Sequence, residues 1–192
     1  MSRAGNRGPD AGRPGLRRGG TRYFVRDAAA ADLEAVLAMK AAAWREAYGH
    51  LRDESFFERA EATLGSQVEH WRSQLAAGRT LWLAEDARGR CVGMAAAGPV
   101  IHGSPSPADD HDSPELQLYS IYVLAQAQGS GVADALLDRA IGSGDCLLWV
   151  LTGNGRARAF YARHGFTAVG DPVPMEGPWS GLDEQLMVRR GA

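Results

Sequence analysis

The spacing of hydrophobic residues along the chain predicts a protein in which helices alternate with strands. Apolar side chains recur three and four positions apart in residues 33–48, 61–77 and 132–141, which is the spacing of a helix with one buried face. Short apolar runs bounded by glycine, proline and polar residues are typical of buried strands. Such runs occupy residues 23–25, 80–84, 91–97, 116–123, 146–151, 166–169 and 186–189.

The N-terminal residues do not follow this pattern. They are rich in glycine and arginine and contain no apolar run, so they cannot bury a core. We expect a disordered tail over residues 1–21 and a single domain over residues 22–192. The arginines of the tail could touch an anionic surface, or the tail could be a solvated extension.

Composition narrows the classes of protein to which the chain can belong. It is 45% hydrophobic and 23% charged, and its formal net charge of −2 gives no support to nucleic acid as the main partner. No stretch resembles a signal peptide or approaches the ~20 apolar residues of a membrane span. We therefore expect a cytoplasmic protein that binds neither nucleic acid nor membrane. Cys91 and Cys146 lie outside any Cys/His pattern, so no metal is expected.

Residues 116–141 combine a strand, a glycine turn and a helix, which is a general arrangement for holding an anion. The first amides of a helix lack partners and its dipole favours negative charge there. Gly129 and Gly131 remove side chains that would keep a phosphate away from those amides. A dinucleotide fingerprint would need glycine where Asp134 stands, and a nucleotide-triphosphate loop would need a nearby lysine, which is absent.

The remaining pattern resembles that of a known family. Gln126-x-x-Gly129-x-Gly131, after an Ile-Tyr-Val strand, resembles the acetyl-coenzyme A pyrophosphate loop of the GNAT superfamily of N-acetyltransferases. One strand later, Asn154 to Phe166 resembles the GNAT segment Asn-x-x-Ala-x-x-Phe-Tyr-x-x-x-Gly-Phe. The resemblance covers about residues 23–189.

The resemblance implies both a fold and a cosubstrate. The fold would be α/β (α+β), with a mixed, mostly antiparallel central sheet of six to seven strands flanked by helices. The parallel strands at 116–123 and 146–151 would splay apart and admit the pantetheine arm of acetyl-coenzyme A, whose backbone pairing would resemble an added strand. The implied coenzyme-binding residues are Ile121, Tyr122, Val123, Gln128, Gly129, Ser130, Gly131, Val132, Ala133, Asn154, Ala157 and Tyr161.

The same resemblance assigns the catalytic acid but not the base. Tyr161 stands where the family places a tyrosine that protonates the departing thiolate. Many relatives carry a glutamate base on the central strand, where this chain has Gln117, which cannot act as a base. Glu115 lies on the same strand face and could serve directly or through water. His102 and His111 in the preceding loop are alternatives.

The acceptor is predicted only as a class. Trp44 and Tyr48, with Gln117, would line its pocket, although Trp44 and Tyr48 could equally pack in the core. The acidic loop 109–115 would suit a cationic acceptor. We expect transfer of acetyl to a primary amine of a small molecule by direct attack. The alternatives are acetylation of a protein amino group, a non-catalytic acyl-coenzyme A sensor, and an interaction protein. A homodimer is compatible with the family.

Overall fold

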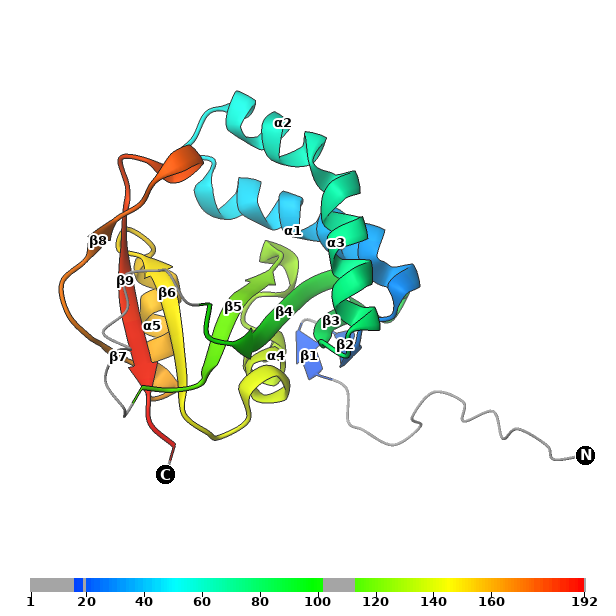
Figure 1. Cartoon of the computed structure of the whole chain (residues 1–192). Helices are drawn as coiled ribbons and strands as arrows, with labels where there is room; N and C mark the ends of the chain where they lie inside the picture. Colours follow the sequence, from blue (N-terminus) through cyan, green and yellow to red (C-terminus); the bar gives the residue numbers. More distant parts are fainter. Residues whose placement is uncertain (1–15, 19, 102–112, 192) are drawn as a thin grey trace, which may run out of the picture.

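The computed structural model describes residues 16–18, 20–101 and 113–191, which form a sheet covered by helices on both faces (Figure 1). Strands follow the order β1-β2-β3-β4-β5-β6-β9-β7, and β8 also pairs with β9. Neighbouring strands are antiparallel except β5 and β6, which are parallel. The predicted mixed, mostly antiparallel sheet is therefore confirmed. The strands are β1 Leu16–Arg18, β2 Thr21–Asp27, β3 Leu81–Asp86, β4 Cys91–Pro99, β5 Leu116–Val123, β6 Cys146–Leu151, β7 Thr167–Ala168, β8 Val173–Pro174 and β9 Asp183–Arg189.

The described residues contain nine strands, more than the six to seven expected. The additional strands, β1 and β8, are too short for an apolar pattern to reveal them. β1 lies within the range predicted as a tail; Gly20 adopts a φ of 83°, and Arg18 pairs with Thr21 across the turn. The other tail residues, 1–15 and 19, lie outside the described residues, so the division at residue 22 stays a prediction.

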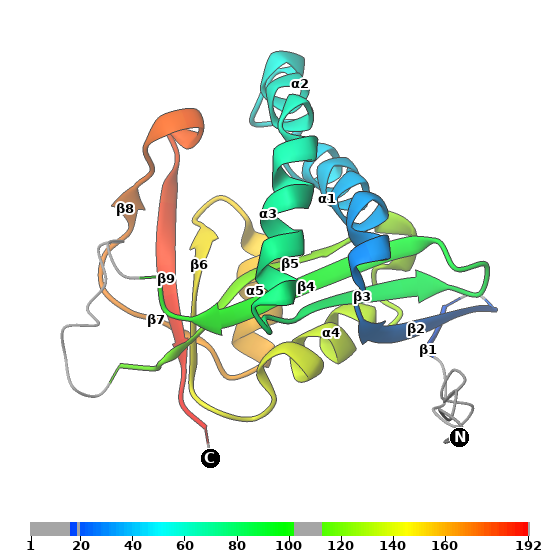
Figure 2. The same ribbon diagram turned by 45° about the vertical axis from the view of Figure 1, so that its right-hand side comes forward.

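Helices on the two faces of the sheet bury separate hydrophobic clusters (Figure 2). The cluster under α4 and α5 includes Leu136, Leu148 and Phe166, each at most 2% exposed. The cluster under α1 and α3 includes Leu37 and Met94. Burying a side chain of this size stabilises a fold by roughly 1.5–3 kcal/mol. The helices are α1 Leu33–Tyr48, α2 Glu54–Ala62, α3 Leu64–Ala76, α4 Val132–Ile141 and α5 Gly155–Arg163. Among the helices that the structure describes, none combines the length and apolar character needed to cross a membrane.

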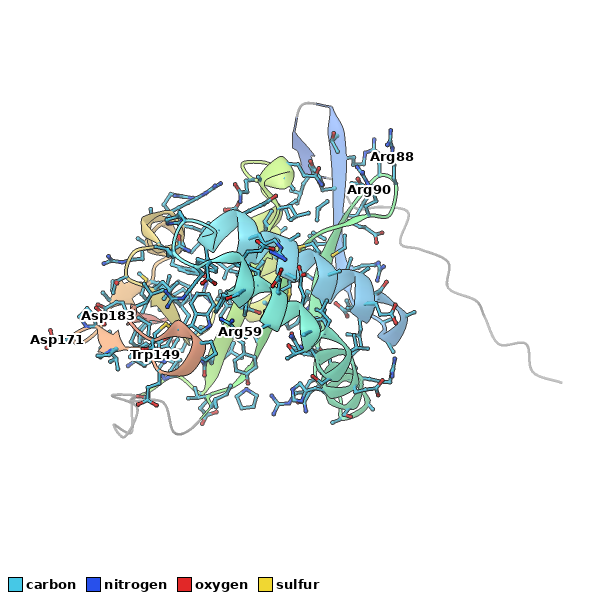
Figure 3. The ribbon with its side chains drawn as sticks, turned by 90° about the horizontal axis from the view of Figure 1, so that it is seen from above. Arg59, Arg88, Arg90, Trp149, Asp171 and Asp183 are labelled. Atoms are coloured by element: carbon cyan, nitrogen blue, oxygen red, sulfur yellow. The ribbon has the colours of Figure 1, made fainter. Side chains whose placement is uncertain are left out.

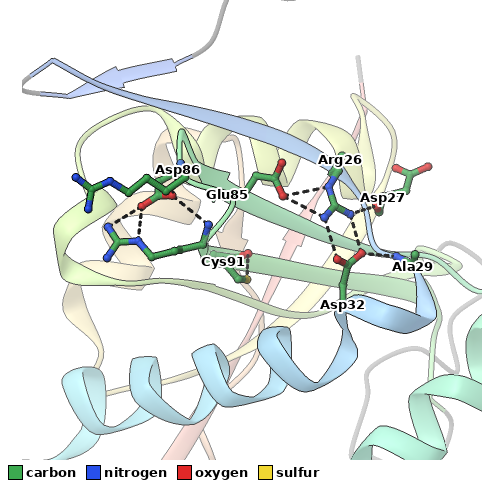
Figure 4. A network of polar contacts seen from close by, with 10 residues as sticks. Arg26, Asp27, Ala29, Asp32, Glu85, Asp86 and Cys91 are labelled. Carbon is green, nitrogen blue, oxygen red and sulfur yellow. Dashed lines mark hydrogen bonds and ion pairs between the residues drawn. The ribbon is translucent and has the colours of Figure 1, made fainter. Parts of the chain in front are cut away.

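An ion-pair network fixes the start of α1 against the sheet (Figure 4). The guanidinium of Arg26 on β2 donates to both carboxylate oxygens of Asp32 at 2.7 and 2.9 Å and to Glu85 on β3 at 3.2 Å. Asp32, in the 3-10 helix η1 (Ala30–Asp32), also accepts a hydrogen bond from the Ala29 amide at 2.7 Å. The Arg26 hydrogen bond lowers the pKa of Asp32. The network thus sets the direction in which α1 leaves the sheet.

The parallel strands β5 and β6 separate soon after they meet. Gln117 and Leu147 are the one pair of residues in register between them, although the strands contain eight and six residues. On the other side of β5, the register with β4 shifts between Ala96 and Ala97, so Tyr119 forms a bulge. A bulge bends its strand, and here the strand bends at the place where it leaves β6. The predicted splayed pair is present in the structure (Figure 2).

Candidate functional site

The open edge of β5 offers backbone hydrogen-bonding groups to a ligand. The Leu124 amide donates to Val92 on β4, and successive residues of an antiparallel strand direct their amides and carbonyls to opposite edges. Ile121 and Val123 therefore direct theirs away from β4, toward the gap left by β6. The carbonyl of Val123 already accepts a hydrogen bond from Gln128 Nε2 at 2.9 Å and keeps a second lone pair. This is the edge predicted to pair with the pantetheine arm.

The glycine turn after β5 is held by hydrogen bonds and leads to the first amides of α4. It runs through the 3-10 helix η3 (Ala125–Ala127) to Gly131, which caps α4 with a φ of 85°. The hydroxyl of Ser130, 8% exposed, donates to the Ala127 carbonyl at 2.6 Å. The turn is also tied to α1, because the Ala125 amide donates to Glu46 at 2.7 Å. The amides that begin α4, including Val132 and Ala133, therefore stand at a fixed place beside the open edge.

Asn154 connects the opposite side of the gap to α1. Its side chain caps α5 by accepting a hydrogen bond from the Ala157 amide at 3.0 Å. The same side chain reaches the hydroxyl of Tyr48, where it lowers the pKa of that phenol but does not offset the increase caused by burial. Two residues predicted for different roles, coenzyme binding and acceptor binding, therefore meet where α5 begins and α1 ends.

Three tyrosines bring their hydroxyls into mutual electrostatic range: Tyr48 on α1, Tyr122 on β5 and Tyr161 on α5. Burial raises the pKa of each one, most clearly for Tyr122 and Tyr161. Tyr161 is 8% exposed, and the charge of an ionised Tyr48 or Cys146 would raise its pKa further. Burial likewise raises the pKa of Cys146 to about 11, so its thiol stays protonated at neutral pH. The three phenols are therefore neutral hydrogen-bond donors.

Trp44 and Tyr48 lie in a cluster of aromatic rings that sequence reasoning only partly identified. Trp44 contacts Tyr122 edge-on at 6.2 Å and stacks on Phe56 of α2 at 6.2 Å. Trp179, in the 3-10 helix η4 (Gly177–Trp179), contacts Trp44 at 5.5 Å, Tyr48 at 5.3 Å and Phe56 at 4.8 Å. Trp179 was not predicted; a tryptophan in an otherwise polar loop was its one signal. Figure 1 shows η4 beside the end of α1.

The candidates for the base have different surroundings. Gln117 accepts a hydrogen bond from the Ile101 amide at 3.1 Å, so its side chain holds the end of the preceding loop. Glu115 is exposed at the start of β5, and its backbone carbonyl accepts from the Val100 amide at 3.0 Å. His102, His111 and the acidic residues 109–112 lie outside the described residues. The assignment of Glu115, like that of Tyr161, stays a prediction. Among residues 16–18, 20–101 and 113–191, no group of three His, Cys, Asp or Glu could hold a metal ion.

Comparisons with known proteins agree with this geometry. Residues 77–168 match the family model described as an acetyltransferase (GNAT) domain. A probable N-acetyltransferase of Mycobacterium tuberculosis is 28% identical over 146 residues, which are 74% of this chain and 78% of that protein. A structure described as histone acetyltransferase HPA2 and related acetyltransferase, from Corynebacterium glutamicum, is 25% identical with a TM-score of 0.62 and covers 88% of this chain and 97% of its own. A phosphinothricin acetyltransferase of Sinorhizobium meliloti in complex with AcCoA shares the fold at 22% identity, with a TM-score of 0.60 and coverage of 88% and 89%.

Proposed function

We propose that the chain is an N-acetyltransferase of the GNAT superfamily and that it transfers acetyl from acetyl-coenzyme A to the amine of a small molecule. The observation that carries the proposal is the gap between β5 and β6. An open strand edge, a glycine turn held by hydrogen bonds and three protonated tyrosine hydroxyls lie around this gap.

Acetyl-coenzyme A fits the residues around the gap. Its pantetheine amides can pair with the free edge at Ile121 and Val123, and its pyrophosphate suits the amides that begin α4. Gly129, with a φ of 74° and nothing within 4 Å of the position of a Cβ, leaves the turn open to such a ligand. The Sinorhizobium meliloti neighbour, which shares the fold, was solved with this cosubstrate.

In the proposed reaction, the acceptor nitrogen attacks the thioester carbonyl, the C–S bond breaks, and the departing sulfur gains a proton while the nitrogen loses one. Tyr161 donates a hydrogen bond to the departing sulfur. Because burial raises its pKa, Tyr161 is fully protonated at neutral pH but is a weaker acid than an exposed phenol. Its contribution is therefore stabilisation of the developing thiolate, followed by transfer of the phenol proton to sulfur; solvent then returns a proton to Tyr161. Glu115, exposed to solvent, takes the proton of the amine through water and releases it to solvent.

A small acceptor is supported by the phosphinothricin acetyltransferase among the structural neighbours. The rival functions, a protein acetyltransferase and a non-catalytic acyl-coenzyme A sensor, share the coenzyme site and differ in the acceptor. Release of free thiol from acetyl-coenzyme A should therefore be measured with a broad panel of small amines and with peptides. Release with peptides alone contradicts the small-molecule proposal, and stabilisation by acetyl-coenzyme A without release from any acceptor supports the sensor.

A matched pair of glycine substitutions tests the coenzyme site itself. Gly129 and Gly89 both have a φ of 74° and open space around a Cβ, so alanine introduces the same backbone strain at each, roughly 1 kcal/mol. Gly89 lies in the β3–β4 turn, away from the gap. We expect Gly129→Ala to raise the KM for acetyl-coenzyme A about tenfold, and Gly89→Ala to leave it unchanged, with similar losses of thermal stability. Equal KM values in the two variants contradict the proposed site.

A further inference from the structure

The aromatic residues near the gap form one wall of the region where an acceptor must approach. We define the aromatic wall as Trp44, Tyr48, Phe56 and Trp179. Each ring lies within 6.2 Å of another, and Trp179 joins the wall from a segment more than a hundred residues distant in sequence. Trp44 also contacts Tyr122, which stands between the two residues of the open strand edge. A molecule against this wall would therefore be next to the strand edge that is proposed to hold the pantetheine arm.

Two side chains at the wall, Trp44 and Arg52, have N–H groups that could donate a hydrogen bond to an oxygen atom of a ligand. Nε1 of Trp44 is buried and makes no hydrogen bond within the described residues. The Trp44 indole approaches the Tyr122 hydroxyl and offsets part of the increase that burial causes in the pKa of Tyr122, yet the contact lacks hydrogen-bond geometry. Leaving a buried N–H without a partner costs free energy, which an oxygen atom of a ligand would recover. Arg52 uses one nitrogen on the Leu51 carbonyl and one on the Ser180 carbonyl, at 3.1 and 2.9 Å, and has further N–H groups.

The charges at the wall disfavour a polycation. The guanidinium of Arg52 lies over the rings of Phe56 and Trp179 at 6.0 and 5.8 Å. Lys40, the single lysine of the chain, places its ammonium 4.9 Å from the ring centre of Trp44. Cations therefore already occupy ring faces that would otherwise attract a second ammonium group. Asp53 lies within electrostatic range of Arg52 and offsets part of its charge. A polyamine would still meet the like charges of Arg52 and Lys40, whereas a carboxylate would meet the guanidinium of Arg52.

We propose that the aromatic wall and Arg52 select an acceptor amine that has a flat apolar body and a carboxylate, and that they discriminate against polyamines. The apolar body lies against the partly exposed rings of Trp44 and Trp179, on the parts that Lys40 and Arg52 leave uncovered. The carboxylate accepts hydrogen bonds from the guanidinium of Arg52, which are stronger because the acceptor is charged. The inference rests on the proposed acetyl transfer, because it assigns the acceptor of that reaction.

Pairs of amines that differ in one carboxylate test the inference. 4-(Aminomethyl)benzoate is compared with benzylamine, phenylalanine with phenethylamine, and all four with spermidine. Binding is followed by tryptophan fluorescence, to which Trp44 and Trp179 contribute two of the five tryptophans of the chain, and turnover by thiol release. We expect the carboxylated member of at least one pair to bind and to react about tenfold or more better than its partner and than spermidine. Equal binding within both pairs, or preference for spermidine, overturns the inference.

Variants of two arginines assign the effect to a residue. Arg52→Gln keeps an amide that can donate to Ser180 but removes the charge, and it should abolish the preference for the carboxylated amine while benzylamine is little affected. Arg59 on α2 is exposed, bonds Ser55 and offers a matched control, Arg59→Gln (Figure 3). An unchanged preference in Arg52→Gln overturns the role of Arg52. Binding of a carboxylated amine without thiol release supports the wall as a binding site and contradicts the acetyl transfer, so the two proposals fail separately.

Discussion

The two ends of α1 differ in one respect, because only the second contains a buried hydrogen-bond donor without a partner among the described residues. At its start, Arg26 has ion pairs to Asp32 at 2.7 Å and to Glu85 at 3.0 Å, and the hydrogen bonds lower the pKa of Asp32 (Figure 4). At its end, the buried N–H of Trp44 has no hydrogen-bond partner within residues 16–18, 20–101 and 113–191, and burial raises the pKa of Tyr48. Arg26 and Asp32 thus have partners at the start of the helix, whereas near its end the indole N–H of Trp44 has none among the described residues.

This contrast separates residues that stabilise the fold from residues that serve a ligand. A polar group that meets its partner within the chain contributes to the free energy of folding. A buried donor without a partner costs stability in the free protein and is retained where a ligand supplies the missing acceptor. Substitutions near Arg26 should therefore change stability at nearly constant activity, and substitutions near the gap should do the reverse.

The largest expected effect is that of Tyr161→Phe. We expect kcat to fall by about 100-fold, because the departing sulfur loses its hydrogen-bond donor, while the KM for acetyl-coenzyme A stays within about threefold. Thiol-release kinetics measure both constants. Tyr119→Phe is the control, since that hydroxyl bonds Pro99 and Arg79 away from the three-tyrosine cluster. Equal kcat values for wild type and Tyr161→Phe would remove Tyr161 from the mechanism.

Asp32→Ala should have the next largest effect, and on stability. It removes two bonds to Arg26 and one to the Ala29 amide, but the Asp32 and Arg26 side chains are 22% and 43% exposed, so solvent screens the pair. We expect the free energy of unfolding to fall by about 1–2 kcal/mol in urea titrations, with kcat nearly unchanged. The exposed Asp138→Ala on α4 is the control. A large loss of kcat at full folding would contradict the contrast between the two ends.

The pH dependence of the free energy of unfolding should also report the Asp32–Arg26 pair, with a smaller effect than the substitution itself. The folded pKa of Asp32 is lower than its unfolded value near 4, so its contribution is present above pH ~4 and is lost as pH falls through the folded pKa. Screening limits this contribution to about 1 kcal/mol. Urea titrations between pH 6 and pH ~3 should therefore show a smaller acid loss for Asp32→Ala than for wild type. Parallel curves would contradict the lowered pKa.

Glu115→Gln should produce the smallest effect. A carboxylate that acts through water gives less acceleration than one in contact, so we expect about a threefold fall in kcat/KM and a flatter acid limb of the pH–rate profile. Stability should not change, because Glu115 is exposed. An unaltered profile would exclude Glu115 as the base.

Local features of this chain could be predicted from its sequence, but contacts between residues that are distant in sequence could not. The glycine turn and the Asn154 cap depend on residues a few positions apart, and the structure has both. Trp179 reaches Trp44 only through the path of β8 and β9, which no periodicity specifies. The hydrogen bond from Ile101 to Gln117 likewise depends on how the preceding loop returns to β5. Functions carried by residues that are close in sequence can therefore be predicted from the sequence. The shape of the acceptor region depends on long-range contacts and cannot.

A single pair of residues in register joins β5 to β6, so the sheet has a weakly bonded boundary between these two strands, which we call the seam. β1 to β5 are joined by one continuous set of antiparallel ladders, and β6 with β9 and β7 forms another, so one pair of residues links the two ladders across the sheet. The amides of Ile121 and Val123 at this seam should exchange with deuterium faster than those of Tyr122 and Leu124, which face β4. Bound cosubstrate would pair with β5 in place of a strand, so exchange at those two amides would slow. The central sheet would then be continuous only while the protein holds its cosubstrate.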